Sequence, residues 1–213
     1  MFLFTNFSYA EHTDTPHELS QAYTWEVIID ESSTIENVLE QEVTMWWSYD
    51  DEFLNALEWM HDYGLTRFDT PERFRPYDVL SRQEAAKFFS QFAKEILYRT
   101  LDQTKYCFFD DMEWVDPSLK NYIIESCLLH MFWWSGWYFF PFDTFTKWQA
   151  LAVLIRWLDG YKDEWGTYRW SEYRQYAWEA WLTKDPNIGH GEKAVTRYEV
   201  ALLLYRAAQK IQK

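Results

Sequence analysis

The sequence predicts an all-α protein built from three helix–loop–helix repeats. Three observations lead to this fold class. A short helix-capping motif occurs three times, each copy is followed by apolar residues at the same helical offsets, and each is preceded by a second amphipathic segment. A unit of two helices that recurs along a chain is typical of helical repeat folds.

The capping motif consists of Ser or Thr, a basic residue, any residue, and then Glu or Gln. It reads SRQE at 81–84, TKWQ at 146–149 and TRYE at 196–199. In such a capping box the hydroxyl accepts a hydrogen bond from the backbone N–H three residues on. The Glu or Gln side chain accepts one from the N–H of the cap residue. Each motif therefore predicts the start of a helix.

Apolar residues follow each motif at offsets of four, seven, eight and eleven from the Ser or Thr. These offsets lie on one face of a helix. The residues are Ala85, Phe88, Phe89 and Phe92; Ala150, Val153, Leu154 and Trp157; and Val200, Leu203, Leu204 and Ala207. We expect the three capped helices to bury this face.

The upstream segments supply the first helix of each repeat. Gly64 is expected to end the first of them, and Asp116-Pro117 to start the second. The expected apolar and small residues are Phe53, Leu57 and Met60; Leu119, Tyr122, Ile123 and Ser126; and, after Ser171, Tyr173, Tyr176, Ala177 and Ala180. The loop between the two helices carries aromatic-x-Pro twice, as Phe74-Arg75-Pro76 and Phe139-Phe140-Pro141.

The charge distribution predicts a boundary just before residue 48. Residues 1–47 hold nine acids and no Lys or Arg, whereas the chain as a whole has 34 acids and 20 bases, a net charge of −14. We expect an acidic segment at 1–47 and a folded body at 48–213. Its first residues, MFLFTNFSYAEHTD, are either a remnant of a signal peptide or the start of a soluble chain.

The negative charge argues against nucleic acid as a partner, and no run is apolar enough to predict a membrane span.

The chemistry-bearing residues show no catalytic or metal-binding signature. Cys107 and Cys127 have no zinc spacing; we favour two buried thiols over the alternative, a single disulfide. The acidic pairs Asp50-Asp51, Asp110-Asp111 and Asp163-Glu164 could bind calcium or act as paired carboxylates, but we favour solvated helix starts. The sequence therefore predicts no cofactor, no metal and no enzyme.

The whole arrangement resembles the S-layer homology domain. The resemblance rests on ALEWMHDYGLTRF…FRPYDVLSRQEAAKFF, on FDD…DPSLKNYI…FFPFDTFTKWQALAVL and on WEAWLTK…AVTRYEVALLLYRA. It covers about residues 48–213 and implies three repeats, at about 48–100, 107–160 and 168–213, in a pseudo-three-fold body. The family's box usually runs Thr-Arg-Ala-Glu, and this chain departs from it at Gln83, Trp148, Tyr198 and Lys147.

The resemblance also implies a function and a location. Proteins of that family bind secondary cell-wall glycopolymers, often pyruvylated, and so anchor surface proteins without a covalent bond. We therefore expect a non-catalytic module at the cell surface whose partner is an anionic wall polysaccharide. Two rivals are a helical module that binds another protein through its aromatic surface and a carbohydrate-active enzyme. The enzyme would need two carboxylates roughly 5–9.5 Å apart across a cleft.

The box cations are the main candidate site residues. Each lies in the first turn of a helix, where the positive end of the helix dipole disfavours a cation. Free backbone N–H groups, the dipole and a cation together could bind the carboxylate of a pyruvyl ketal or an acidic sugar. The alternative is that each cation pairs with a nearby acid such as Asp78, Asp143 or Glu192. The candidate ligand-binding residues are Arg82, Lys147, Arg197, Glu84, Gln149, Glu199 and Gly64.

Gly64 is a candidate because glycine lets backbone approach a ligand closely, although a left-handed helix cap would explain it equally well. The matching positions in the other copies are His130 and Trp181.

Tryptophan is in excess and glycine is scarce. The chain has fourteen Trp and six Gly, whereas about 7% glycine is usual. If UGA codons specify glycine in the source and were translated as tryptophan, Trp would stand at glycine positions. The candidates are Trp133, Trp134, Trp137, Trp148, Trp157, Trp165, Trp178 and Trp181. The alternative is a set of true tryptophans that stack on sugars. If the eight codons are all UGG, the hypothesis is wrong.

Overall fold

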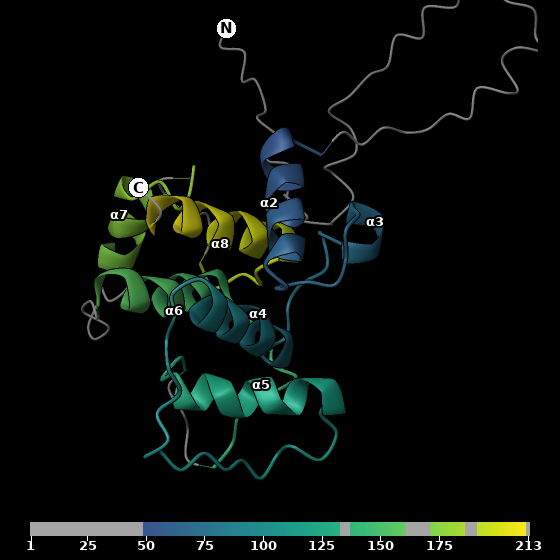
Figure 1. The fold of residues 1–213 in the computed structure, drawn as a ribbon. Coiled ribbons are helices and arrows are strands. Elements are labelled where there is room, and N and C mark those ends of the chain that lie inside the picture. Colours follow the sequence, from purple (N-terminus) through teal and green to yellow (C-terminus); the bar gives the residue numbers. More distant parts are fainter. Residues whose placement is uncertain (1–48, 133–136, 161–170, 186–190, 212–213) are drawn as a thin grey trace, which may run out of the picture. The chain divides into compact units, whose positions relative to one another are not determined.

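The computed structural model describes residues 49–132, 137–160, 171–185 and 191–211 (Figure 1). The chain divides between Trp47 and Ser48 into two units, and these ranges all belong to the second. The predicted acidic segment and its candidate signal-peptide remnant lie outside the described residues. The predicted domain boundary and repeat limits stay predictions.

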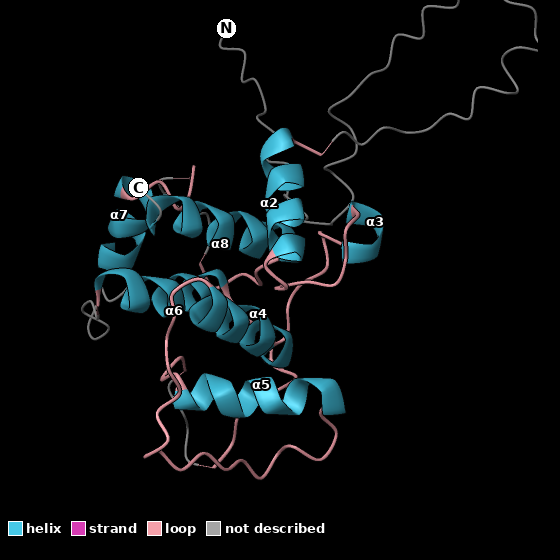
Figure 2. Cartoon of the chain, in the orientation of Figure 1, coloured by secondary structure: helices cyan, strands magenta, loops and turns pink. Residues whose placement is uncertain are grey.

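The described residues form seven helices and no strand, which confirms the all-α prediction (Figure 2). The first helices of the three predicted copies are α2 (Asp51–Asp62), α5 (Pro117–Leu128) and α7 (Ser171–Glu179). The second helices are α4 (Arg82–Glu95), α6 (Lys147–Asp159) and α8 (Arg197–Ile211). A four-residue helix, α3 (Pro71–Phe74), lies in the loop of the first copy.

All three capping boxes form as predicted. The side chains of Glu84, Gln149 and Glu199 each accept a hydrogen bond from the backbone N–H of the cap residue at 3.0 Å. α5 starts at the predicted Asp116-Pro117, where the Asp116 carboxylate accepts from the Ser118 N–H at 2.8 Å. Local side-chain hydrogen bonds thus define the helix starts, as the sequence suggested.

The core is built from the predicted apolar faces. Phe89 and Phe92 of α4, Leu154 of α6 and Leu204 of α8 are fully buried. Of the twelve residues predicted for this face, Trp157 is the exception, since it is only partly buried. α4 packs beside α5, α2 beside α8, and α6 beside α7 (Figure 1).

Three backbone hydrogen bonds join the residues just before the capping boxes into a closed ring. Phe145 N–H donates to Leu80 C=O at 2.8 Å, Leu80 N–H to Val195 C=O at 3.0 Å, and Val195 N–H to Phe145 C=O at 2.9 Å. All three side chains are buried, at no more than 2% exposure. The three loops are therefore tied to one another directly in front of the capped helices.

Residues that match between the copies also share left-handed backbone. Gly64, His130 and Trp181 follow the first helices and have φ of 69°, 56° and 58°. Arg75 and Phe140, the middle residues of the two Phe-x-Pro motifs, have φ of 56° and 59°. The backbone turn is thus kept where the residue type changes.

Cys107 and Cys127 form a disulfide, so the favoured prediction of two free thiols is wrong. The bond ties the loop before α5 to the last turn of that helix, with the two Cα atoms 6.0 Å apart. Spacing of two cysteines alone could not decide this, because the pairing depends on how the loop folds back. Among the described residues, no helix is long and apolar enough to cross a membrane.

Candidate functional site

The N–H groups at the starts of the capped helices are not free, contrary to the expectation from the sequence. Arg82 N–H donates to Asp143 C=O at 2.9 Å, and Gln83 N–H donates to Pro141 C=O at 3.0 Å. The other two boxes repeat this arrangement. In the second box the backbone N–H groups of Lys147 and Trp148 donate to the carbonyls of Lys193 and Gly191, respectively. In the third box those of Arg197 and Tyr198 donate to the carbonyls of Asp78 and Pro76. The loop of a neighbouring copy caps each helix, so an anion cannot bind these N–H groups.

The order of these contacts is cyclic. The helix start of the first copy meets the loop of the second, that of the second meets the loop of the third, and that of the third meets the loop of the first. We call each such junction a seam: the Arg82 seam, the Lys147 seam and the Arg197 seam. Every box cation lies at a seam, and any anion site there depends on side chains.

Two of the three box cations pair with the box acid of another copy. Lys147 Nζ lies 2.5 Å from Glu199 Oε1, and Arg197 Nη2 lies 2.6 Å from Glu84 Oε1. The Arg197 side chain is only 17% exposed, so its pair is more strongly shielded from water than an ordinary surface pair. The structure thus brings four of the candidate residues together in two pairs.

The sequence did suggest ion pairs as an alternative, but with the wrong acids. Asp78 pairs with Arg75 instead of a box cation, and Asp78 and Asp143 meet Arg197 and Arg82 through their backbone carbonyls. The true partners lie more than fifty residues away in sequence, so proximity along the chain could not identify them.

Glu84 carries its negative charge under ordinary conditions. Burial alone would raise the pKa of its carboxyl, but the hydrogen bonds from Ser81 and from Arg197 outweigh burial and lower that pKa. One oxygen, Oε2, accepts from the Ser81 N–H, and the other faces Arg197. The same carboxylate therefore caps α4 and neutralises the cation of α8.

Arg82 differs from the other two box cations, because it makes no ion pair within the described residues. Its Nε donates to Phe139 C=O at 3.0 Å, and its guanidinium lies 4.7 Å from the Phe132 ring centroid and 5.1 Å from that of Phe139. Burial lowers the pKa of Arg82, while Asp143 and Asp111 oppose that shift. Cation–π contacts with these two rings stabilise the Arg82 guanidinium, whereas a carboxylate stabilises the cations of the other two boxes.

Gln149 explains part of this difference. Its Oε1 accepts the Thr146 N–H, as the Glu oxygens do in the other boxes. The remaining atom of its side-chain head is an amide nitrogen, which donates hydrogen bonds and carries no negative charge. Gln149 therefore keeps the cap but cannot neutralise a guanidinium.

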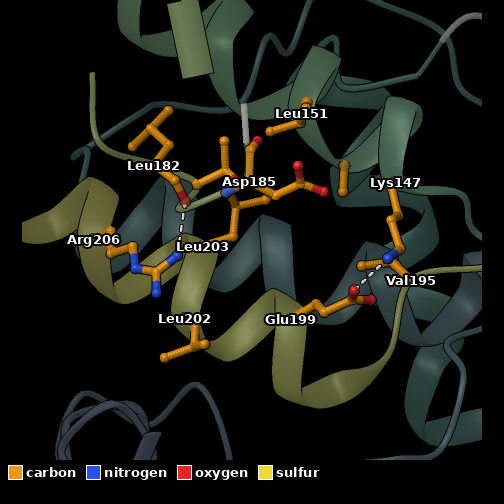
Figure 3. A pocket seen from close by; sticks show the side chains of 11 residues that line it. Lys147, Leu151, Leu182, Asp185, Val195, Glu199, Leu202, Leu203 and Arg206 are labelled. Carbon is orange, nitrogen blue, oxygen red and sulfur yellow. Dashed lines mark hydrogen bonds and ion pairs between the residues drawn. The ribbon is translucent and has the colours of Figure 1, made fainter. Parts of the chain in front are cut away.

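A small cavity of about 130 Å³ opens beside the Lys147 seam (Figure 3). Its walls are mostly apolar, with the Lys147–Glu199 pair on one side and Arg206 on the other. The lining residues are Lys147, Ala150, Leu151, Leu182, Thr183, Asp185, Val195, Glu199, Leu202, Leu203 and Arg206. Pockets for whole ligands usually have ~300 Å³ or more, so this cavity fits a single substituent better than a sugar ring.

Arg206 is fixed by a carboxylate from another copy. Its Nε and Nη2 donate to Glu52 Oε1 and Oε2 at 2.7 and 2.9 Å, and Lys184 Nζ donates to the same carboxylate at 2.5 Å. The hydrogen bond from Arg206 is the main reason that the pKa of Glu52 falls to about 2, with Lys184 adding to it and burial opposing it. This cluster joins the start of α2 to α8.

Gly64 has no hydrogen bond or ion pair with a box cation within the described residues. Its carbonyl accepts from Gln91 Nε2 at 2.8 Å, and a Cβ atom at this position would meet nothing within 4 Å. Its φ of 69° lies in the left-handed region, which favours glycine. The conformational explanation therefore accounts for Gly64 better than a close approach of ligand.

Asp111 is a positioning residue that the sequence reasoning missed. Its carboxylate accepts from the backbone N–H groups of Phe139 and Phe140 at 2.9 and 2.6 Å. It thus fixes the left-handed turn that offers the Phe139 carbonyl to Arg82. The prediction of a solvated helix start is therefore wrong for Asp111. It is correct for Asp50, whose Oδ1 caps α2. The third pair, Asp163-Glu164, lies outside the described residues.

The tryptophan hypothesis gains support at one position. Trp181 has a φ of 58° and is 73% exposed, in the place where the first copy has Gly64. Three other candidates, Trp148, Trp157 and Trp178, lie inside helices, where glycine would weaken the helix. A Cβ at Gly191 would lie 1.7 Å from the Trp148 ring. The tryptophan ring thus occupies space that is open only because residue 191 is glycine. Trp133, Trp134 and Trp165 lie outside the described residues.

Within the described ranges, no group of three or more His, Cys, Asp or Glu residues could hold a metal ion. Compared with known proteins, the chain matches no family model and has no significant match among the curated proteins.

Proposed function

We propose that the chain is a non-catalytic module that binds an anionic polysaccharide of the cell wall and so tethers a surface protein. The observation that carries this proposal is the cyclic arrangement of the three seams, each with a box cation next to aromatic or apolar side chains. In this proposal the three copies are related by pseudo-three-fold symmetry. The closed ring of hydrogen bonds among Leu80, Phe145 and Val195 supports that symmetry.

The side chains at the seams suit an acidic sugar. Arginine donates several hydrogen bonds in one plane, which matches a carboxylate or a phosphate. Phe132 and Phe139 beside Arg82 offer flat apolar faces, and the cavity beside Lys147 offers room for a small apolar substituent. A pyruvyl ketal combines both features, a carboxylate and a methyl group, and is one ligand of this chemical type.

The disulfide supports the proposed location outside the cytoplasm. Stable disulfides form in oxidising compartments and are rare where thiols are kept reduced. Cys107 and Cys127 are joined across twenty residues, and the structure describes no unpaired cysteine. A cell-surface module meets this condition.

A pull-down on purified cell-wall sacculi tests the proposal. The full chain should be retained, and Arg82→Ala together with Arg197→Ala should lower retention at least about tenfold, because each removes a charged donor. Lys210→Ala is the matched control, since it removes one charge from an exposed position of α8. Retention that ignores both Arg substitutions would contradict the anion mechanism, and no retention of the wild type would contradict the function.

A second candidate is a module that binds another protein. The observation in its favour is a group of exposed aromatic residues in the second copy, at 42–80% exposure. The group consists of Tyr106, Phe108, Trp114, Trp137, Tyr138, Phe140 and Phe142. No retention of the wild-type chain on purified sacculi would favour this candidate.

A further inference from the structure

Two loops of the second copy, before α5 and before α6, carry aromatic residues alternately inside and outside. Phe109 and Phe139 are buried, and their ring centroids lie 5.5 Å apart. The aromatic residues near them in each loop are 42–80% exposed. We call these the four-ring surface, and its members are Tyr106, Phe108, Tyr138 and Phe140.

The exposed rings form two pairs with defined geometry. The centroids of Tyr106 and Phe108 are 6.5 Å apart, with an angle of 18° between the ring planes. Those of Tyr138 and Phe140 are 5.9 Å apart, with an angle of 35°. Each pair therefore offers two rings of similar orientation to the solvent.

Covalent and hydrogen bonds hold both loops in place beneath these rings. Cys107, which separates the first two rings in sequence, is bonded to Cys127 of α5. Asp110 N–H donates to Trp137 C=O at 2.9 Å and so joins the two loops. The Asp111 carboxylate accepts from two backbone N–H groups of the second loop, at 2.9 and 2.6 Å. A ligand that binds here does not have to pay for ordering the loops.

The first copy shows that the fold does not require exposed aromatic residues at these positions. Phe74 of the first Phe-x-Pro motif is buried, as its counterpart in the second copy is. The residues on either side of it are Arg73 and Arg75, each paired with a nearby Asp. The second copy has Tyr138 and Phe140 there. Exposed rings bury little area and so add little stability, which points to a role in binding.

The charge and composition of the two loops favour a neutral, hydroxylated ligand. Residues 106–116 and 137–145 contain no Lys or Arg, so they would repel an anionic polymer. Their acids are Asp110, Asp111, Glu113, Asp116 and Asp143. Interfaces with proteins are enriched in Arg and Met besides aromatic residues, whereas every large apolar side chain exposed in these two ranges is aromatic.

Sugars match this combination of side chains. The C–H groups on one face of a sugar ring pack on an aromatic face, and the hydroxyl groups around its edge need acceptors. The carboxylates of Asp110 and Glu113 are exposed and can accept hydrogen bonds from hydroxyl groups. Tyr106 and Tyr138 add phenol groups that donate and accept.

The four-ring surface adjoins the Arg82 seam. Phe139 lies between Tyr138 and Phe140 in the chain, and its carbonyl accepts from Arg82 Nε at 3.0 Å. Its ring centroid is also 5.1 Å from the Arg82 guanidinium. A polysaccharide bound through a charged group at Arg82 would therefore have further sugars next to the exposed rings.

We propose that the four-ring surface binds neutral sugar residues of the wall polysaccharide, by stacking, as a second contact beside the cations of the seams. An open surface of this kind binds with a Kd of about 1 mM or weaker, so stacking alone does not retain the chain on peptidoglycan. The wall polysaccharide as the source of the sugars rests on the proposed function, whereas the stacking itself does not.

Titration calorimetry of the full chain with two neutral oligosaccharides, cellohexaose and N-acetylated chitohexaose, tests the surface. At least one of them should bind, and about 1 M salt should leave the affinity unchanged, because no charged group of the ligand takes part. Tyr106→Ala and Tyr138→Ala should each weaken binding about threefold to tenfold, because each removes one exposed ring.

Tyr77→Ala is the matched control. Tyr77 is 65% exposed and takes the place in the first copy that Phe142 has in the second. Its ring stacks on Tyr49 and Tyr198, away from the four-ring surface. The substitution should leave binding of the oligosaccharides unchanged, and all three variants should unfold at the temperature of the wild type.

Three results would overturn the proposal: no binding of either oligosaccharide, equal losses with Tyr106→Ala and Tyr77→Ala, or binding that is lost in about 1 M salt. Self-association of the chain that Tyr106→Ala and Tyr138→Ala abolish would assign the surface to a second copy. Capture of a wall protein that the same substitutions abolish, with no binding of either oligosaccharide, would assign it to a protein.

Failure of the proposed function looks different. Oligosaccharide binding that depends on Tyr106, together with no retention on sacculi, would contradict the wall partner and leave the sugar surface intact. Retention on sacculi that is lost with Arg82→Ala and Arg197→Ala, together with no binding of either oligosaccharide, would contradict the four-ring surface alone.

Discussion

In the first copy the box acid is Glu84, which neutralises Arg197, whereas in the second copy the matching residue is Gln149, which carries no charge. The backbone contacts around the two boxes are nevertheless alike. Phe74 C=O accepts from Arg197, and Phe139 C=O accepts from Arg82. The loops and caps therefore define the seam, while the charges on it vary from copy to copy.

The largest effect is expected at the buried phenylalanines. Phe74 and Phe139 are 1% and 0% exposed, and truncation of a buried Phe costs about 3–5 kcal/mol. Phe74→Ala and Phe139→Ala should each lower the free energy of unfolding by that amount, because the two copies use the residue in the same way. Urea unfolding measures both. A cost in one copy and none in the other would show that the loops are not equivalent.

The second-largest loss of stability is expected from removal of the disulfide, which lies in the second copy. The disulfide closes a loop across twenty residues, and a crosslink of that length stabilises by about 3 kcal/mol. The double variant Cys107→Ser, Cys127→Ser should lose this amount in urea unfolding without reductant. Adding reductant to the wild type should bring it to the level of the variant, and an unchanged wild type would contradict the assignment.

Glu84→Ala and Gln149→Ala sharpen the comparison of charges. Both remove a cap, worth about 1 kcal/mol, but only Glu84→Ala also leaves a shielded guanidinium without its acid. We expect a loss of about 2–3 kcal/mol for Glu84→Ala and about 1 kcal/mol for Gln149→Ala in thermal or urea unfolding. Equal losses would mean that the Glu84–Arg197 pair contributes nothing.

In the third copy, Trp181 holds the left-handed position after the first helix, and its replacement by glycine is expected to increase stability. A non-glycine residue at φ near 58° is strained, so Trp181→Gly should raise the free energy of unfolding by about 1 kcal/mol. Trp178→Gly is the control, because it lies inside α7 and should cost about 1 kcal/mol. If Trp181→Gly destabilises as much as the control, the tryptophan belongs at its position.

The smallest effect is expected in the pH dependence of stability. It again distinguishes the first two copies, because Glu52 in α2 is replaced by Ser118 at the matching position of α5. The pKa of Glu52 is about 2 in the folded chain, below its ordinary value of 4.5. Its stabilisation is therefore fully present above pH 4.5 and is lost as pH falls from 4.5 through 2. Glu52→Gln should unfold with less dependence on pH across that window. An unchanged dependence in urea unfolding would remove Glu52 as the cause.

Local features of the fold were predictable from the sequence, and contacts between copies were not. The three boxes and their apolar faces depend on residues within one helix, so their spacing was sufficient. The pairing of Arg197 with Glu84 joins residues 113 positions apart and depends on how the copies close on each other. The role of Asp111 depends on the fold of a distant loop, since its carboxylate binds the backbone of Phe139, 28 residues away.

The most direct test of the proposed function compares sacculi before and after acid extraction of their anionic polysaccharide. The full chain should co-sediment with untreated sacculi and stay in solution with extracted ones, because the partner is the charged polymer and not the peptidoglycan. Adding the released polymer back should compete for the chain. Equal sedimentation with both preparations, or none with either, would contradict the account.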